Sequence, residues 1–73
     1  MTEEELKQKF AEKLQRKMEH EGIDQHRLAM RSGISESSIS KYISGDQLPK
    51  LHAVVRIAKA LQASLYELIP IER

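Results

Sequence analysis

The first third of the chain carries an apolar residue at every fourth position, with mostly polar residues in between. These positions are Leu6, Phe10, Leu14 and Met18. Because an α-helix turns once in about 3.6 residues, this spacing places the four side chains in one stripe along a helix. The pattern predicts a helix over residues 2–21 that ends at Gly22 and packs its stripe into a core. The alternative for the first turns is that Leu6 and Phe10 cover a partner.

Two shorter helices are predicted between residues 24 and 45. Asp24 and Ser35 have side chains that can accept hydrogen bonds from the free N–H groups at the start of a helix. Gly33 follows the first of these helices and Gly45 the second, and glycine turns the chain with a positive φ at no steric cost. Each helix also has an apolar residue before its cap and another four positions into the helix, the spacing of a hydrophobic staple. The pairs are Ile23 with Leu28 and Ile34 with Ile39.

Apolar residues recur at three- and four-residue spacing after Pro49, which predicts a helix over about residues 50–61. The residues expected to face inward are Leu51, Val54, Val55, Ala58 and Leu61. Ser64 and Glu67 then have the spacing of a capping box, so a short last helix is expected over residues 65–69.

The composition agrees with an all-α fold in a single domain over residues 1–73. The chain has two prolines and three glycines, and no run of β-branched residues favours a strand. The absence of cysteine excludes disulfides and Cys-based zinc sites. No apolar run approaches the ~18 residues of a membrane span, and the N-terminus is too charged for a secretory signal. We therefore expect a cytoplasmic protein.

The segment QHRLAMRSGISESSISKYISG, residues 25–45, resembles the helix-turn-helix of the Cro/CI-type (XRE-like) repressor family of bacteria and phages. The matching residues are Gln25, Leu28, Ala29, Gly33, Ile34, Ile39 and Gly45. The resemblance extends over about residues 14–69 and implies a compact five-helix, lambda-repressor-like DNA-binding domain. It also implies a transcriptional regulator, a repressor, that binds a palindromic operator in double-stranded DNA.

An outward face of the second short helix carries small polar and charged side chains. Ser37, Ser40 and Lys41 follow Glu36 by one, four and five positions, which places the four side chains on one face of a helix. When a helix enters the major groove, a lysine there can donate to guanine, a glutamate can accept from cytosine N4, and serine hydroxyls can do either. The resemblance places base-reading roles on Glu36, Ser37 and Lys41, and we add Ser40 as a candidate.

Phosphate contacts are expected near the helix starts, where free N–H groups and the positive end of the helix dipole favour an anion. Gln25 lies in such a first turn, and the resemblance also implies a backbone contact there. Ser35, Ser44 and Lys50 are the further candidates. Arg27 and Arg31 are equally compatible with phosphate contact and with an ordinary surface role.

Apolar residues gather at the C-terminal end of the chain, and the resembled repressors pair through this region. The residues expected at a homodimer interface are Leu65, Tyr66, Ile69 and Ile71. A two-fold dimer would place two recognition helices about 34 Å apart along the duplex.

No residue pattern supports catalysis or metal binding. His20, His26 and His52 lack the spacing that places two ligands on one helix face. The serines do not lie in a glycine-flanked nucleophile elbow. We expect no enzyme activity, no cofactor, no metal and no small-molecule substrate.

Some residues depart from the family pattern. Ser32 stands where an apolar residue usually packs under the turn, and Met30 is the expected substitute for its bulk. Gln62 lies at a helix end where glycine is common, and Asp46 would sit close to phosphates. With a net charge of only +1, Asp46 and Glu36 leave an alternative open: a helical protein-interaction module, antitoxin-like or partner-binding, with weak or no DNA binding.

Overall fold

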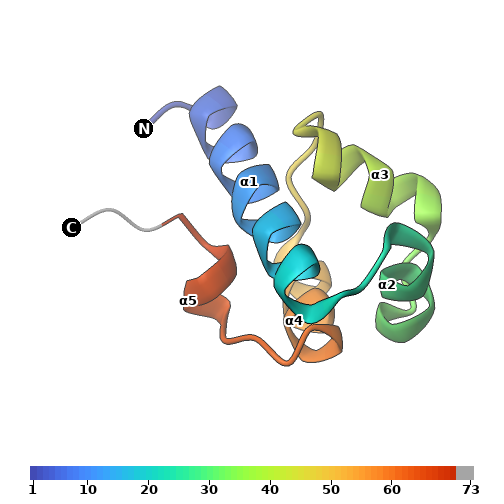
Figure 1. Ribbon diagram of the computed structural model, residues 1–73. Helices are drawn as coiled ribbons and strands as arrows, with labels where there is room; N and C mark the ends of the chain where they lie inside the picture. Colours follow the sequence, from blue (N-terminus) through green and yellow to red (C-terminus); the bar gives the residue numbers. More distant parts are fainter. Residues whose placement is uncertain (71–73) are drawn as a thin grey trace.

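The structure is a computed structural model that describes residues 1–70. This part of the chain contains five helices (Figure 1). The helices are α1 Glu3–Glu21, α2 Gln25–Ser32, α3 Glu36–Ser44, α4 Leu51–Ala60 and α5 Leu65–Leu68. The all-α, five-helix fold class predicted from the sequence is confirmed. The predicted bounds differ from these by one residue at the start of α1, at both ends of α4 and at the end of α5.

The residues predicted to cap or end α2 and α3 do so in the structure. Asp24 Oδ1 accepts from the backbone N–H of Arg27 at 2.8 Å, and Ser35 Oγ accepts from the N–H of Ser38 at 3.2 Å. The left-handed φ of +73° at Gly33 ends α2, which lets the chain change direction within the three residues that separate α2 from α3.

The core takes at least one fully buried side chain from every helix. These side chains are Leu14, Leu28, Ile39, Ile57, Leu61 and Leu68. Phe10 is also buried, at 3% exposure, so the structure places it in the core and not on a partner-facing surface. The helix α1 lies between α3 and α5 and packs against both of them (Figure 1).

The inward face of α4 agrees with the predicted one at Val54, Ala58 and Leu61, which are buried, and differs from it at two positions. Leu51 was expected to face the core but is 70% exposed, and Val55 is half-buried. The buried face also includes Ala53 and Ile57, which the prediction did not name. The physical reason is that Leu51 is the first helical residue, at the edge of the domain, whereas Ile57 lies over the centre of the core.

The turn between α2 and α3 also differs from expectation. Met30 does not supply bulk under the turn, because its side chain is 71% exposed. Ser32 is itself buried, at 7% exposure. Its hydroxyl donates to the carbonyl of Ala29 at 3.4 Å and accepts from the N–H of Ile34 at 3.3 Å. The serine therefore stabilises the turn through hydrogen bonds where the family uses apolar packing.

The corrected face of α4 leads to a stability prediction. We expect Ile57→Val to lower the free energy of unfolding by about 0.5–1.5 kcal/mol, because it removes a methylene group from a fully buried site. Leu51→Ala removes more atoms but from an exposed site, so we expect a change below about 0.5 kcal/mol. Urea denaturation measures both, and the opposite ranking would contradict the buried face described above.

Gln62 follows α4 with a φ of +54°, which makes it a non-glycine residue in the left-handed region. We expect Gln62→Gly to raise the free energy of unfolding by roughly 0.5–1 kcal/mol, because relief of backbone strain exceeds the entropy that glycine adds to the unfolded chain. Gln47→Gly is the matched control at an exposed site without positive φ, and it should be neutral or destabilising. Equal effects of the two changes in urea denaturation would refute the strain argument.

Candidate nucleic-acid interface

The helix α3 presents one polar face to solvent and one apolar face to the core. Glu36, Ser37, Ser40 and Lys41 are all exposed. On the opposite side, Ile39 is fully buried and Tyr42 is 7% exposed. The structure therefore brings the four residues predicted to read bases onto one accessible surface.

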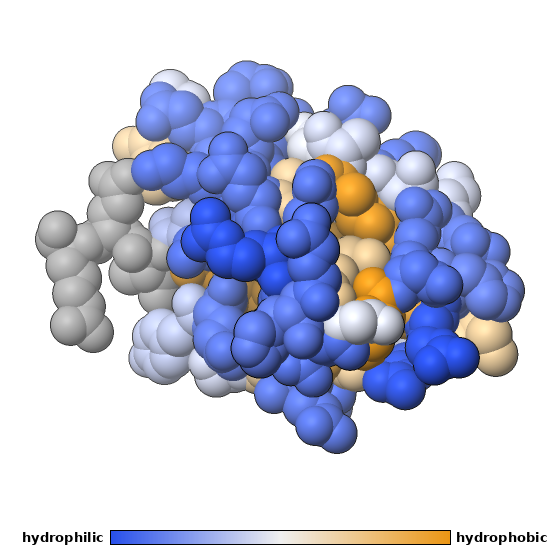
Figure 2. Space-filling model, in the orientation of Figure 1, coloured by the Kyte–Doolittle hydropathy of each residue, from blue (hydrophilic) through white to orange (hydrophobic). Residues whose placement is uncertain are grey.

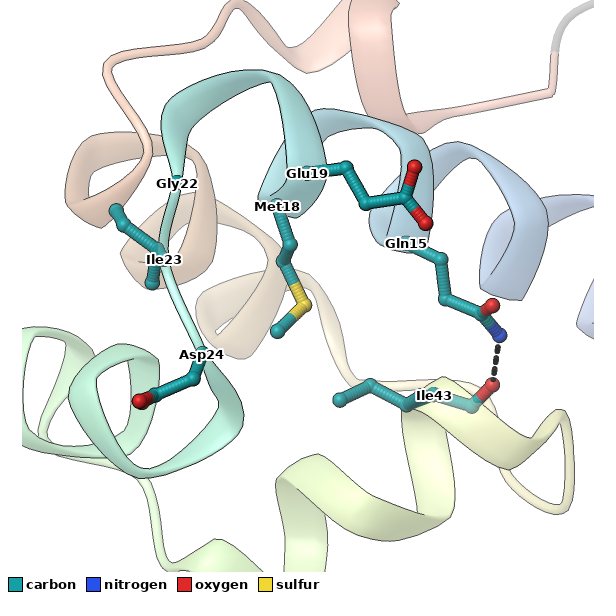
Figure 3. A pocket seen from close by; sticks show the side chains of 7 residues that line it. All are labelled: Gln15, Met18, Glu19, Gly22, Ile23, Asp24 and Ile43. Carbon is teal, nitrogen blue, oxygen red and sulfur yellow. Dashed lines mark hydrogen bonds between the residues drawn. The ribbon is translucent and has the colours of Figure 1, made fainter.

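The C-terminal end of α3 is fixed to α1. The side-chain amide of Gln15 donates from Nε2 to the backbone carbonyl of Ile43 at 2.7 Å (Figure 3). Such a bond satisfies one of the carbonyls that a helix leaves free at its C-terminus. Because Gln15 belongs to the long helix α1, this contact limits the movement of α3 relative to the core.

An apolar hollow lies beside this hydrogen bond. It has a volume of about 430 Å³, and its lining includes Met18, Ile23 and Ile43, with Gln15, Glu19, Gly22 and Asp24 around them (Figure 3). Figure 2 shows apolar atoms at the bottom of a depression between hydrophilic surfaces on this face. The hollow separates α1 from the start of α2 and the end of α3.

The N-terminal end of α3 is held by the first turn of α2. The side-chain amide of Gln25 donates to the backbone carbonyl of Glu36 at 3.3 Å. Nδ1 of His26 lies 3.0 Å from Oε2 of Glu36, so the imidazole donates to the carboxylate. This hydrogen bond raises the pKa of His26, and the nearby charges of Glu36 and Asp24 act in the same direction.

Sequence reasoning missed the pairing of His26 with Glu36. The two residues are ten positions apart, and they meet only because the turn at Gly33 brings the starts of two helices together. Arg56 was missed for the same reason. Its Nη1 lies 3.7 Å from the position that a Cβ on Gly33 would occupy, which places a cation from α4 over the turn.

The residues predicted to contact phosphate have different surroundings. Lys50 is exposed before α4, and Gln25 is half-buried. Ser35 Oγ accepts from the N–H of Ser38 and donates to Ser38 Oγ, and Ser44 Oγ donates to the carbonyl of Lys41 at 3.1 Å. Both hydroxyl protons are thus used within α3, which leaves their oxygens as acceptors and poorly suited to a phosphate.

Three of the predicted dimer residues, Leu65, Tyr66 and Ile69, lie on and just after α5, on the other side of α1 from α3 (Figure 1). Leu65 and Tyr66 are 36% and 76% exposed, and Ile69 is half-buried. Ile71 lies outside the described residues. The ion pair between Lys17 Nζ and Glu67 Oε1, at 3.2 Å, connects this short helix to α1.

The electrostatics of α5 agree with that attachment. The backbone N–H of Ser64 donates to the Glu67 carboxylate at 2.7 Å. This bond, followed by the hydrogen bond from Lys17, lowers the pKa of Glu67. The same contact with Glu67 raises the pKa of Lys17. Each group thus favours the charged form of the other.

Other kinds of site find no support in the described residues. Within residues 1–70, no three His, Cys, Asp or Glu side chains gather closely enough to hold a metal ion. None of the described helices is long and apolar enough to cross a bilayer.

Comparison with known proteins agrees with this geometry. A sequence model of the helix-turn-helix family HTH_3 matches residues 13–68. No curated protein matches the chain at a significant level. Among solved structures, the restriction-modification controller protein C.AhdI from Aeromonas hydrophila is 28% identical and superposes with a TM-score of 0.80. That match covers 84% of this chain and 92% of the controller protein. The chain therefore belongs to the Cro/CI-type helix-turn-helix family of DNA-binding transcription regulators.

Proposed function

We propose that this protein is a cytoplasmic, non-enzymatic repressor that recognises a palindromic operator in double-stranded DNA as a homodimer. The observation that carries the proposal is the accessible polar face of α3, which is fixed at one end by Gln15 and at the other by Gln25. A helix held in this way can enter the major groove without first losing much conformational entropy.

The side chains of that face have distinct roles in the proposal. Lys41 donates to guanine N7 and O6, which gives the strongest discrimination available to this set. Ser37 and Ser40 donate or accept and so discriminate weakly. Glu36 accepts from cytosine N4, and its charge disfavours a phosphate nearby.

Phosphate contacts orient the helix without reading sequence. Gln25 lies in the first turn of α2, where free N–H groups favour an anion. Its side-chain amide donates one N–H to the carbonyl of Glu36 and has a second for a phosphate. Lys50 contributes a positive charge before α4. Ser35 and Ser44 are weaker candidates than the sequence suggested, because their hydroxyl protons are already used within α3. The exposed Arg56 is a further cation near the turn.

A second candidate function is a protein-interaction module with the same fold. The observation that favours it is the low charge of the chain, +1 overall, together with the exposed Asp46 just after the recognition helix. Selection from a random duplex library separates the two functions. Failure to enrich any sequence, with elution from heparin at the lowest ionic strength, would favour the interaction module.

The proposed base contact leads to a prediction about Lys41. On the sequence recovered by such a selection, Lys41→Ala should cost about 1–3 kcal/mol of binding free energy and relax the preference at one base position. Gln25→Ala should weaken all sequences alike, because it removes a donor to the DNA phosphates and an anchor of α3 but no contact with a base. Lys59→Ala is the matched control, since it removes an exposed lysine from the last turn of α4. Fluorescence anisotropy on a panel of single-base variants measures these effects. An unchanged base preference in Lys41→Ala would refute the proposed docking.

The proposed homodimer leads to a prediction about Tyr66. Tyr66→Glu should shift the chain toward the monomer and weaken operator binding, because a charge replaces an apolar contact in the proposed interface. Met30→Glu is the control at a similarly exposed apolar site, 71% against 76% for Tyr66. Sedimentation equilibrium, with and without operator DNA, measures the association state. A wild-type chain that is monomeric at high micromolar concentration in both conditions would exclude the dimer.

A further inference from the structure

The first residue of α3 is held by two consecutive residues of α2. Gln25 donates to the backbone carbonyl of Glu36 at 3.3 Å, and His26 donates to its carboxylate at 3.0 Å. Among residues 1–70, His26 and Gln25 are the residues whose side chains form hydrogen bonds with Glu36. The imidazole therefore limits the movement of the Glu36 carboxylate and sets its direction.

Both members of the pair remain accessible to a ligand. The side chain of His26 is 67% exposed and that of Glu36 is 52% exposed. Exposed pairs of this kind contribute little to folding stability. We therefore expect the main effect of the His26–Glu36 contact on ligand binding at this surface and not on folding.

The charge of the pair decides how it meets DNA. A lone carboxylate at the start of the recognition helix opposes the phosphates on either side of the groove. When His26 carries a proton, the pair is neutral, while a Glu36 oxygen can still accept from a base. The neutral imidazole can hold the carboxylate by its N–H, but it leaves the negative charge uncompensated.

From these contacts we propose that His26 is a positioning residue that sets the specificity of Glu36, aiming its carboxylate at a cytosine N4 amino group, and that the protonated pair is the form that binds DNA. The inference rests on the proposed DNA-binding function and adds to it a residue and a dependence on pH. The charged groups that act on His26 are Glu36 from α3 and Asp24 at the start of α2.

The direction of the pH effect follows from these groups. Glu36 and Asp24 raise the pKa of His26 in the free protein. Phosphates around the bound helix favour the imidazolium further, so binding takes up protons. The affinity for DNA is therefore greatest below the pKa of the free protein and falls as the pH rises through the pKa of the complex.

The test compares wild type with His26→Gln, which keeps an N–H donor but removes the titrating charge. Operator affinity is measured from pH 5.5 to 8.5 at fixed ionic strength. We expect wild-type affinity to be roughly threefold to tenfold higher at the acidic end, because bound DNA favours the protonated imidazole. His26→Gln should show a flat profile. His20→Gln and His52→Gln are the matched controls and should keep the wild-type profile.

Two further measurements make the test independent of overall affinity. Glu36→Gln should lower the pKa of His26 toward its ordinary value in the free protein, as followed by the imidazole resonances in NMR. His26→Ala should weaken the preference for cytosine at the position where Glu36→Gln abolishes it. A contact with a structural role alone would show the same titration, but it would leave the preference for one base unchanged.

The outcomes distinguish this inference from the proposed function. If wild type binds its operator but His26→Gln keeps the wild-type pH profile, or Glu36→Gln leaves the titration of His26 unchanged, the inference is overturned while DNA binding remains. If wild type binds no duplex at any pH, the proposed function fails, and the inference fails with it.

Discussion

The turn between α2 and α3 has to bring the N-terminal ends of two helices to one surface within very few residues. Gly33 makes this possible by taking a left-handed φ of +73°, and Ala29 keeps the two helices close because its side chain is small and buried. The buried hydroxyl of Ser32 then bonds on both sides of the turn. Once this geometry is fixed, Gln25 and His26 can reach Glu36, and the accessible face of α3 has a defined direction.

The distribution of charge explains why contacts to bases matter so much in the proposed function. With 12 basic and 11 acidic residues, the chain has little positive charge to release counterions from DNA, so non-specific affinity should be low. Asp46 and Glu36 lower it further on the recognition side. In the proposed function, affinity for an operator comes from the few polar groups of α3, from charge compensation by His26, and from the pairing of two copies of the domain.

Local chemistry was enough to predict most of the fold, but contacts between helices were beyond it. Caps such as Asp24 and the turn at Gly33 depend on neighbouring residues, so the bounds of α2 and α3 could be predicted. On α4 the burial of Val54 and Ala58 could be predicted, but the choice between Leu51 and Ile57 could not, because both fit the periodicity and only the position of the core decides between them. The bond between His26 and Glu36 spans two helices and leaves no periodic signal. The position of Arg56 near the turn at Gly33 also depends on how separate helices pack, so it leaves no periodic signal either.

The short helix α5 couples the proposed dimer to the fold itself. Four residues are too few to form a stable helix alone, and α5 is held by the buried Leu68 and by the contact of Glu67 with Lys17. In the described part of the chain, Leu65 and Tyr66 of this helix are 36% and 76% exposed. A second copy packing on them would bury apolar surface and stabilise α5 at the same time, because any partner that binds only the folded form adds to its stability. Since α1 packs against both α5 and α3, the proposed interface would also limit the movement of α3, the helix proposed to contact DNA.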